Sequence, residues 1–304
     1  MLEFKDKGLY CPQANIYIDP WLPVDNALIT HAHSDHSRRG SKRYLAHTQS
    51  ASVMRLRLGS DIELQTIDYN KDIFINGVKI SFHPAGHIIG SAQIRLEHKG
   101  EVWVVSGDYK TEYDGLSPAF EPVKCHAFIT ESTFGLPIYK WKPQEEIYKE
   151  INTWWAENSA AGLTSVLFGY PLGKIQRLLF HLDRSIGRVF AHGAVINVNE
   201  ALINDGAPIP LVERVNLEAN KKDFAGSIVL ATPSALGTPW IRKFQPYSTG
   251  LASGWMNLRG AKRRRPVDRG FVLSDHADWP SLLQTIKDTE AEKIFVTHGY
   301  KSAF

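Results

Sequence analysis

A cluster of three histidines and one aspartate lies within the six residues from His31 to His36. It directly follows the apolar run 27–29, which is typical of a short buried strand. A strand that leads into a tight loop can direct His31 and His33 toward one metal ion, while Asp35 and His36, further round the turn, face a second. The segment therefore predicts two adjacent metal ions and a dinuclear metallohydrolase.

Two other interpretations of this cluster stay open at this point. Histidine is often a hydrogen-bonded residue of the core or an incidental surface residue. A single metal ion would also need fewer ligands than a pair of ions. The choice depends on whether more ligands of the right chemical type follow along the chain.

Three candidate ligands do follow, each just beyond a strand-like run. His87 lies in a turn between two such runs, Asp108 follows the apolar residues 102–105, and His298 follows the residues 294–297. A rigid sheet presents ligands from loops in this way. Each of them taken alone could equally be an ordinary turn residue.

The order of these motifs resembles that of a known family. THAHSDH, AGHIIGSA and SGDY are similar to the motifs of the metallo-β-lactamase fold, and TESTFG, LSDHAD and VTHGY are similar to motifs A, B and C of its β-CASP nuclease branch. Within that branch the chain most resembles the bacterial exonucleases associated with DNA ligase and helicase genes. The resemblance implies an α/β fold, namely an αββα sandwich with an inserted β-CASP domain.

The same resemblance implies a set of metal ligands. One ion would be bound by His31, His33 and His87, the other by Asp35, His36 and His298, with Asp108 bridging them. A carboxylate suits the bridge because it offers two oxygens and a negative charge to two cations. Zinc is the expected metal and manganese the alternative. The resemblance also makes Asp19 a residue that orients ligands without binding metal, although a carboxylate there could merely start the turn at Pro20.

Hydrolysis of a phosphodiester also needs a proton for the departing sugar oxygen. His276 is the candidate general acid, oriented by Glu131, and these two residues complete the expected catalytic set together with Asp35. The alternative for His276 is a surface loop histidine, because Asp275 and Asp278 make its segment polar.

Composition agrees with an ordinary soluble protein. The 304 residues suffice for one large core and an inserted domain. No apolar run is long enough to span a bilayer and the amino terminus is mixed and charged, so we expect a cytoplasmic location and no membrane partner. Cys11 and Cys125 lack metal-ligand spacing and are expected to be packed thiols. A net charge of +3 is too small to indicate a nucleic-acid partner by itself.

The sequence contains two candidate contacts for a nucleic-acid phosphate: a run of basic residues and a lysine in a glycine-containing turn. The run could bind a phosphate backbone or be a solvated loop; its basic residues are Arg259, Lys262, Arg263, Arg264 and Arg265. Lys174 follows Gly173 between a predicted strand and a predicted helix, where backbone amides can bind phosphate. A plain turn with a surface lysine fits Lys174 equally well.

The hydrophobic pattern changes near residue 137. Before it, short strands alternate with turns, as in a packed β-sandwich; after it, strands at 165–168 and 227–231 alternate with helices at 144–157 and 175–182. We therefore expect a metallo-β-lactamase domain at 1–136 and 246–304 and an inserted β-CASP domain at 137–245. The resemblance also implies a closing helix after His298, yet the sequence ends at Phe304.

The predicted function is a metal-dependent nuclease, favoured as a DNA exonuclease of DNA repair that associates with a DNA ligase and a helicase. Nucleic acid is the expected partner, with DNA favoured over RNA by the finer resemblance alone. The alternatives are an RNA-processing nuclease of the same family and a small-molecule metallohydrolase, which would not need Glu131, His276 or the basic run. A binding protein with a degenerate site would lack some of the ligands, and every expected ligand is present.

Overall fold

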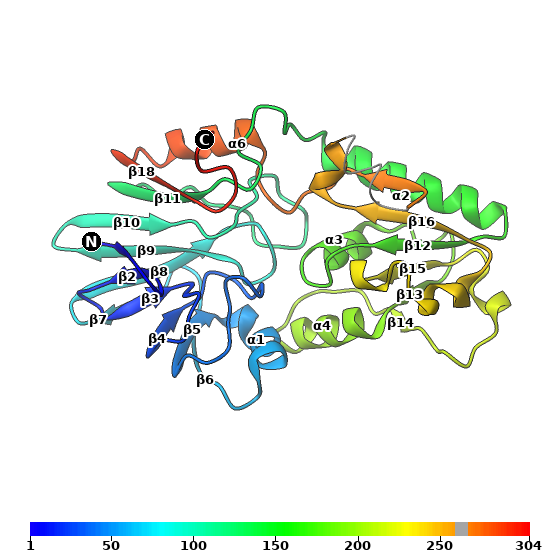
Figure 1. Cartoon of the computed structure of the whole chain (residues 1–304), viewed down its shortest axis with the longest axis horizontal. Coiled ribbons are helices and arrows are strands. Elements are labelled where there is room, and N and C mark those ends of the chain that lie inside the picture. Colours follow the sequence, from blue (N-terminus) through cyan, green and yellow to red (C-terminus); the bar gives the residue numbers. More distant parts are fainter. Residues whose placement is uncertain (259–266) are drawn as a thin grey trace. The chain divides into compact units, whose positions relative to one another are not determined.

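The computed structural model describes residues 1–258 and 267–304 (Figure 1). The predicted basic run, from Arg259 to Arg265, lies outside the described residues. The chain divides into two compact units: the first comprises Met1–Lys140, Asn204–Ala207 and His276–Phe304, and the second comprises Trp141–Ile203 and Pro208–Asp275.

The first unit contains two sheets of six strands each. One sheet has its strands in sequence order, antiparallel from β1 to β3 and parallel from β3 to β6. Its strands are β1 (Glu3–Lys5), β2 (Gly8–Cys11), β3 (Ile16–Ile18), β4 (Asn26–Leu28), β5 (Arg43–His47) and β6 (Glu63–Ile67).

The second sheet of this unit has the order β18-β11-β10-β9-β8-β7, with parallel pairing only at β10-β11-β18. Its strands are β7 (Asp72–Ile75), β8 (Val78–Pro84), β9 (Ala92–His98), β10 (Glu101–Val105), β11 (Ala127–Glu131) and β18 (Lys293–Thr297). The unit also has helices α1 (Ala51–Leu58) and α6 (Trp279–Asp288). The short strands predicted before residue 137 are confirmed by β6 to β10.

Both sheets contribute to one hydrophobic core, which explains why β10 is a continuous apolar run. Trp103 and Val105 pack into the core between the sheets, with Leu28 and Leu45 among the residues from the other sheet. Val102 and Val104 face the opposite side, where Ile286 of α6 packs against them. Because a strand directs successive side chains to opposite faces, a strand covered on both faces is apolar throughout.

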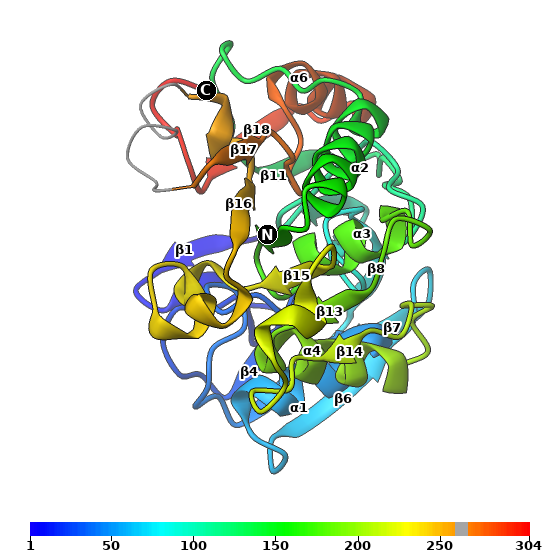
Figure 2. The same cartoon turned by 90° about the vertical axis from the view of Figure 1, so that its right-hand side faces the viewer.

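The second unit contains a sheet of six parallel strands in the order β14-β13-β15-β12-β16-β17. Figure 2 shows the strands of this sheet after a quarter turn about the vertical axis. Its strands are β12 (Thr164–Phe168), β13 (Val189–Ala191), β14 (Glu213–Arg214), β15 (Ile228–Ala231), β16 (Tyr247–Ala252) and β17 (Arg269–Phe271). Its helices are α2 (Gln144–Ala160), α3 (Lys174–His181) and α4 (Gly193–Asn204).

Strand pairing places the end of the second unit later than the predicted domain boundary at residue 245. β16 pairs with β12 and β17 pairs with β16, so both strands belong to the parallel sheet, and the second unit ends at Asp275. The predicted change to alternating helices and strands after residue 137 is confirmed by α2, β12, α3 and β15. The chain is thus a mixed α/β protein, as expected.

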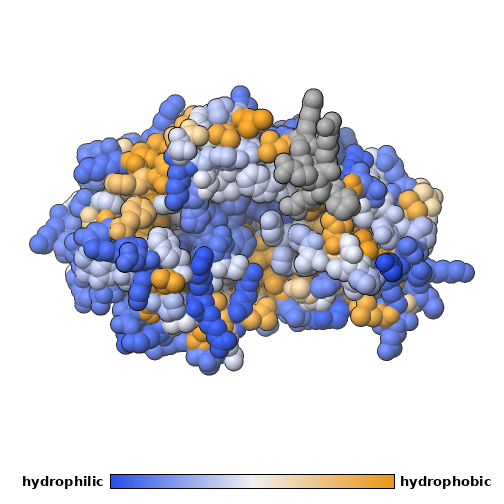
Figure 3. Space-filling model, in the orientation of Figure 1, coloured by the Kyte–Doolittle hydropathy of each residue, from blue (hydrophilic) through white to orange (hydrophobic). Residues whose placement is uncertain are grey.

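One face of the molecule is largely hydrophilic, with hydrophobic residues scattered over it (Figure 3). No helix among residues 1–258 and 267–304 is both long and apolar enough to cross a membrane.

Candidate metal centre

Asp19 fixes the loop that follows β4. Its carboxylate accepts a hydrogen bond from the Thr30 amide at 2.8 Å and another from the Thr30 hydroxyl at 2.6 Å. The same carboxylate lies 2.7 Å from Nδ1 of His36. Because a carboxylate only accepts, this contact assigns the proton to Nδ1 and directs the Nε2 lone pair of His36 away from Asp19.

Thr30 orients a second histidine. Its hydroxyl donates to Asp19, so it can accept from Nδ1 of His31, which lies 3.1 Å away. His31 and His36 therefore both present Nε2 to the same space. The sequence argument missed Thr30, although a hydroxyl beside a metal-binding histidine could have identified it.

The loop itself is a tight turn held from both sides. The amides of His36 and Ser37 donate to the carbonyl of His33 at 3.1 and 2.8 Å. Arg57, in the last turn of α1, donates from Nη1 to the carbonyl of Ala32 at 2.7 Å. The backbone between the two predicted ligands His31 and His33 is therefore anchored by a side chain that the sequence argument did not single out.

Glycine allows the other two loops to approach this turn. Gly107, directly before Asp108, has φ +57°, and a Cβ there would lie 2.7 Å from Cβ of Thr30. Gly86, directly before His87, has φ +71°, and its Cβ would lie 2.1 Å from the carbonyl oxygen of Lys110. Only glycine combines this conformation with such close packing.

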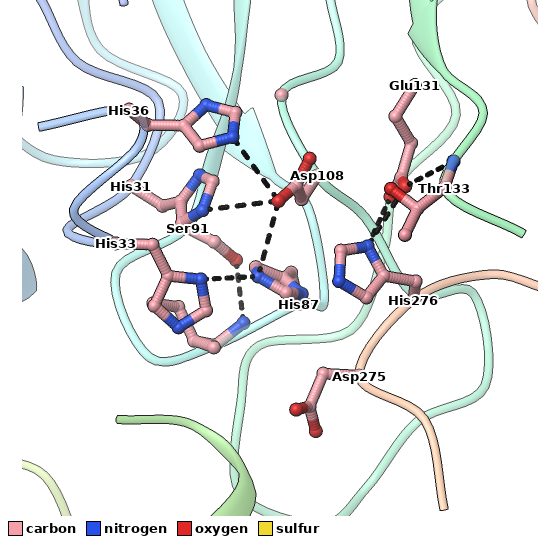
Figure 4. A network of polar contacts seen from close by, with 12 residues as sticks. His31, His33, His36, His87, Ser91, Asp108, Glu131, Thr133, Asp275 and His276 are labelled. Atoms are coloured by element: carbon pink, nitrogen blue, oxygen red, sulfur yellow. Dashed lines mark hydrogen bonds and ion pairs between the residues drawn. The ribbon is translucent and has the colours of Figure 1, made fainter. Parts of the chain in front are cut away.

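The structure brings all the predicted metal ligands into two groups of donor atoms, each group lying within 4.8 Å (Figure 4). The first group is His31, His33, His87 and Asp108, and the second is Asp35, His36 and His298. Figure 4 shows His31, His36 and His87 turned toward Asp108. The rings of His36 and His298 lie 4.7 Å apart.

Three donor atoms of these groups are buried and form no hydrogen bond. Metal ligands show this property in a structure that contains no metal ion. Nε2 of His31, Nε2 of His36 and Oδ1 of Asp108 have none. The two Nε2 atoms approach Oδ2 of Asp108 only to 3.5 and 3.3 Å. A buried polar atom without a partner costs free energy, and metal ions bound at the two groups would satisfy all three atoms.

The spacing of two ring nitrogens also fits a shared metal. Nδ1 of His33 lies 3.1 Å from Nε2 of His87. Two imidazole ligands of a tetrahedral zinc ion, each about 2.0–2.1 Å from the metal, have nitrogens about 3.3 Å apart. The donor set, which is imidazole with carboxylate, suits zinc or manganese.

Electrostatics within the centre favour an ion pair between Asp108 and His36 and a neutral ring at His31. Burial alone would raise the pKa of Asp108, but His36 holds it well below its usual value. Burial would lower the pKa of His36, yet Asp108 and Asp19 raise it well above its usual value. Burial and then the charge of His36 hold the pKa of His31 well below its usual value. A metal ion at Nε2 of His36 therefore competes with a proton at that atom.

Glu131 and His276 form a third group with Asp108. Nδ1 of His276 lies 3.0 and 2.9 Å from the two oxygens of Glu131. Glu131 also accepts the amide of Tyr109 at 2.7 Å and is nearly buried, whereas the side chain of His276 is 20% exposed. The carboxylate is thus fixed by the backbone, and the imidazole is the part that solvent can reach.

Lys174 does not lie where a phosphate contact would require. Its side chain is 2% exposed, and its ammonium group forms a 2.8 Å ion pair with Asp275 and donates to the carbonyl of Leu273 at 2.7 Å. The turn before α3 therefore presents no exposed lysine, contrary to the predicted phosphate-binding residue. The predicted contacts of the run from Arg259 to Arg265 lie outside the described residues.

The fold and these groups define an α/β protein with clustered histidine and aspartate side chains suited to metal ions. No family model matches the chain. It is 30% identical over 300 residues to a protein of Opitutus terrae described as a probable DNA ligase, in a match that spans 98% of this chain and 29% of that protein.

Two endoribonucleases are also similar to the chain. The ysh1 protein of Emericella nidulans is 33% identical over 178 residues, which are 58% of this chain and 19% of that protein. The YSH1 protein of Saccharomyces cerevisiae is 27% identical over 165 residues, 54% of this chain and 20% of that protein. The chain thus spans less than a third of the length of these curated relatives.

Among solved structures, a protein of unknown function from Enterococcus faecalis V583 has a TM-score of 0.66 and 11% identity, over 92% of this chain and 76% of that one. At this identity the likeness concerns the fold alone. The sequence relatives confirm the resemblance that the motifs indicate, because they are consistent with the β-CASP metallo-β-lactamase family.

Proposed function

We propose that the protein is a metal-dependent nuclease that hydrolyses phosphodiester bonds, acting as a DNA exonuclease in DNA repair. One observation carries this proposal: Asp108 belongs both to a metal-ligand group and to a group with Glu131 and His276. A hydrolytic site for a phosphodiester needs both a place for metal ions and a nearby proton donor for the departing oxygen.

Two divalent ions fit the ligand groups, with zinc as the expected metal and manganese as the alternative. His31, His33 and His87 would bind one ion, Asp35, His36 and His298 the other, and Asp108 both. Such a pair lowers the pKa of a water molecule and stabilises the negative charge that develops on a phosphodiester. Asp19 acts through His36, whose ring orientation it sets by the 2.7 Å contact at Nδ1.

His276 supplies the proton for the leaving oxygen in this proposal. Its Nδ1 proton is directed at Glu131, so the transferred proton is carried on Nε2. The Tyr109 amide holds the Glu131 carboxylate in place, and the carboxylate in turn orients the His276 ring. A small-molecule metallohydrolase would have no use for this pair, which is why we favour a nuclease.

DNA is the favoured substrate, because the match to the probable DNA ligase of Opitutus terrae spans almost the whole chain. An RNA-processing nuclease is the second candidate, since the ysh1 endoribonucleases match over half of the chain or slightly more. By the same relationship we propose an association with a DNA ligase, and by the resemblance of the motifs an association with a helicase. In this proposal the first compact unit is the metallo-β-lactamase domain and the second is the β-CASP domain, with the boundary after residue 245 moved to Asp275.

The test uses single-stranded DNA and RNA of one sequence, each labelled at one end. The metal-loaded protein is incubated with each strand, with a chelator-treated sample as the control, and products are resolved by length. We expect a ladder from one end of the DNA that the chelator abolishes. Internal cuts in RNA would favour the second candidate, and two intact strands with both metals would overturn the nuclease proposal.

The role of His276 can be tested separately. His276→Ala is expected to retain both metals and to lose about 10²–10⁴-fold in kcat on DNA, the range that general acid catalysis contributes. His98→Ala is the matched control and should keep full activity, because the His98 ring bonds to the carbonyl of Gly77 in the β7–β8 turn and belongs to none of the ligand groups. Equal activity of His276→Ala and the parent would remove His276 from the mechanism.

A further inference from the structure

Two cations and one carboxylate lie buried together in the second unit. Nζ of Lys174 and Nη1 of Arg177 approach the same oxygen of Asp275 at 2.8 and 2.7 Å. The three side chains are 2%, 1% and 7% exposed. The two cations come from α3 at positions three residues apart, which lie on one face of a helix.

The same cations bind the backbone on either side of this ion pair. Lys174 donates to the carbonyl of Leu273 at 2.7 Å, and Arg177 donates to the carbonyl of Ser274 at 2.9 Å. The segment of three residues that ends at Asp275 is thus bound to α3 through two carbonyls and one carboxylate. This set of contacts specifies the path of the backbone as well as the position of one side chain.

Stability alone is a poor explanation for such a cluster. Removing charges from water is costly, and well-packed apolar side chains of similar size often stabilise a protein as much or more. Buried ionic groups are instead well suited to fix a single arrangement, because each hydrogen bond requires a defined geometry. The question is therefore what the arrangement of this segment serves.

The next residue along the chain is His276. The residue after it, Ala277, donates its amide to the carbonyl of Tyr109 at 2.7 Å, and the His276 ring contacts Glu131. Hydrogen bonds therefore hold the backbone on both sides of His276: residues 273–275 before it and the Ala277 amide after it. A small displacement of a proton donor from its substrate has a large effect on rate.

We propose that Lys174, Arg177 and Asp275 form a positioning cluster that fixes the backbone before His276 and so holds its imidazole in the orientation needed for proton donation. This inference rests on the proposed function. The cluster acts through the peptide chain, so its members are positioning residues without substrate contact.

Lys174→Met is the variant that tests the cluster. It removes the ammonium group and its bond to Leu273, keeps most of the apolar stem, and leaves Arg177 paired with Asp275. Arg188→Met is the matched control, because Arg188 is an exposed cation of the same unit that pairs with Glu213. Metal content and melting temperature are measured for each variant.

Activity is measured on single-stranded DNA and on bis(4-nitrophenyl) phosphate, whose nitrophenolate leaves without needing a proton. We expect Lys174→Met to lose about 10–100-fold in kcat on DNA with little change in KM, and to stay within about threefold of the parent on the activated ester. In the His276→Ala background the same substitution should cause no further loss on DNA.

Equal losses on both substrates, or a further loss in the His276→Ala background, would show a merely structural role and overturn the inference. Unchanged activity of a folded Lys174→Met protein would overturn it as well. If Lys174→Met does not fold, Arg177→Met, which leaves Lys174 paired with Asp275, provides the same test and is expected to give the same selective loss. A parent protein that cleaves neither substrate would instead refute the proposed function, so the two failures are distinguishable.

Discussion

Asp19→Asn would remove the charge that orients His36 with very little change of shape. Asp19 has φ 43°, a left-handed conformation that asparagine adopts more readily than most residues, so the backbone should be retained. Its carboxylate accepts three hydrogen bonds, two from Thr30 and one from His36. An amide in its place brings an NH2 group against one of these donors.

Two effects of different kind are expected. One donor loses its acceptor, which should destabilise the protein by about 1–3 kcal/mol. In addition His36 loses the carboxylate that keeps its proton on Nδ1, and such a change weakens metal binding by about 10–100-fold. That loss corresponds to about 1.4–2.8 kcal/mol of binding free energy.

Competition against a chromophoric chelator measures the zinc affinity, and urea unfolding of the metal-free protein measures the stability. The control is Asp25→Asn, which removes an exposed carboxylate paired with Lys42 at 2.7 Å and should change neither quantity appreciably. Parent-like zinc affinity in a folded Asp19→Asn protein would refute the argument that Asp19 acts through His36.

Two further predictions concern stability. Burial lowers the pKa of His47 to about 4, so below pH 6.5 the unfolded chain binds more protons than the folded one and stability falls as the pH falls. In urea unfolding without metal, His47 should lower the free energy of unfolding by about 1.4 kcal/mol at pH 5.5 relative to pH 7.5. If His47→Phe shows the same pH dependence of this free energy as the parent, the prediction is wrong. Gly107→Ala should unfold at lower denaturant than Gly100→Ala: both glycines have positive φ, but only at Gly107 would a Cβ meet another atom within 4 Å. Equal midpoints for the two variants would show that the contact with Thr30 relaxes without cost.

Some site features were predictable because they depend on local sequence. His31, His33 and His36 closely follow the end of β4, so one tight turn brings their side chains together. This turn depends on local sequence alone. The role of Asp19 was expected from its motif alone, and its contact with His36 agrees with that expectation, although the role itself stays a prediction.

Lys174 shows where local sequence was insufficient. A lysine after glycine at the start of a helix resembles a phosphate-binding turn whether it is exposed or buried. Its burial depends on Asp275, which is about a hundred residues further along the chain. The predicted boundary at 245 differs from the end of the second unit for a related reason. The apolar pattern of β16 predicts a strand, but it does not indicate which sheet the strand joins.

The sequence by itself determined where short alternating strands give way to helices and strands in alternation, the α/β class, and the chemical types of the candidate metal ligands. These properties depend on residue spacing and on functional groups. Tertiary structure decided which atoms share a centre: Asp108 with His31 and His87, and Glu131 with His276. It also decided which charges are buried together. Such contacts join residues distant in sequence, and they form only when the strands that carry them pair and pack.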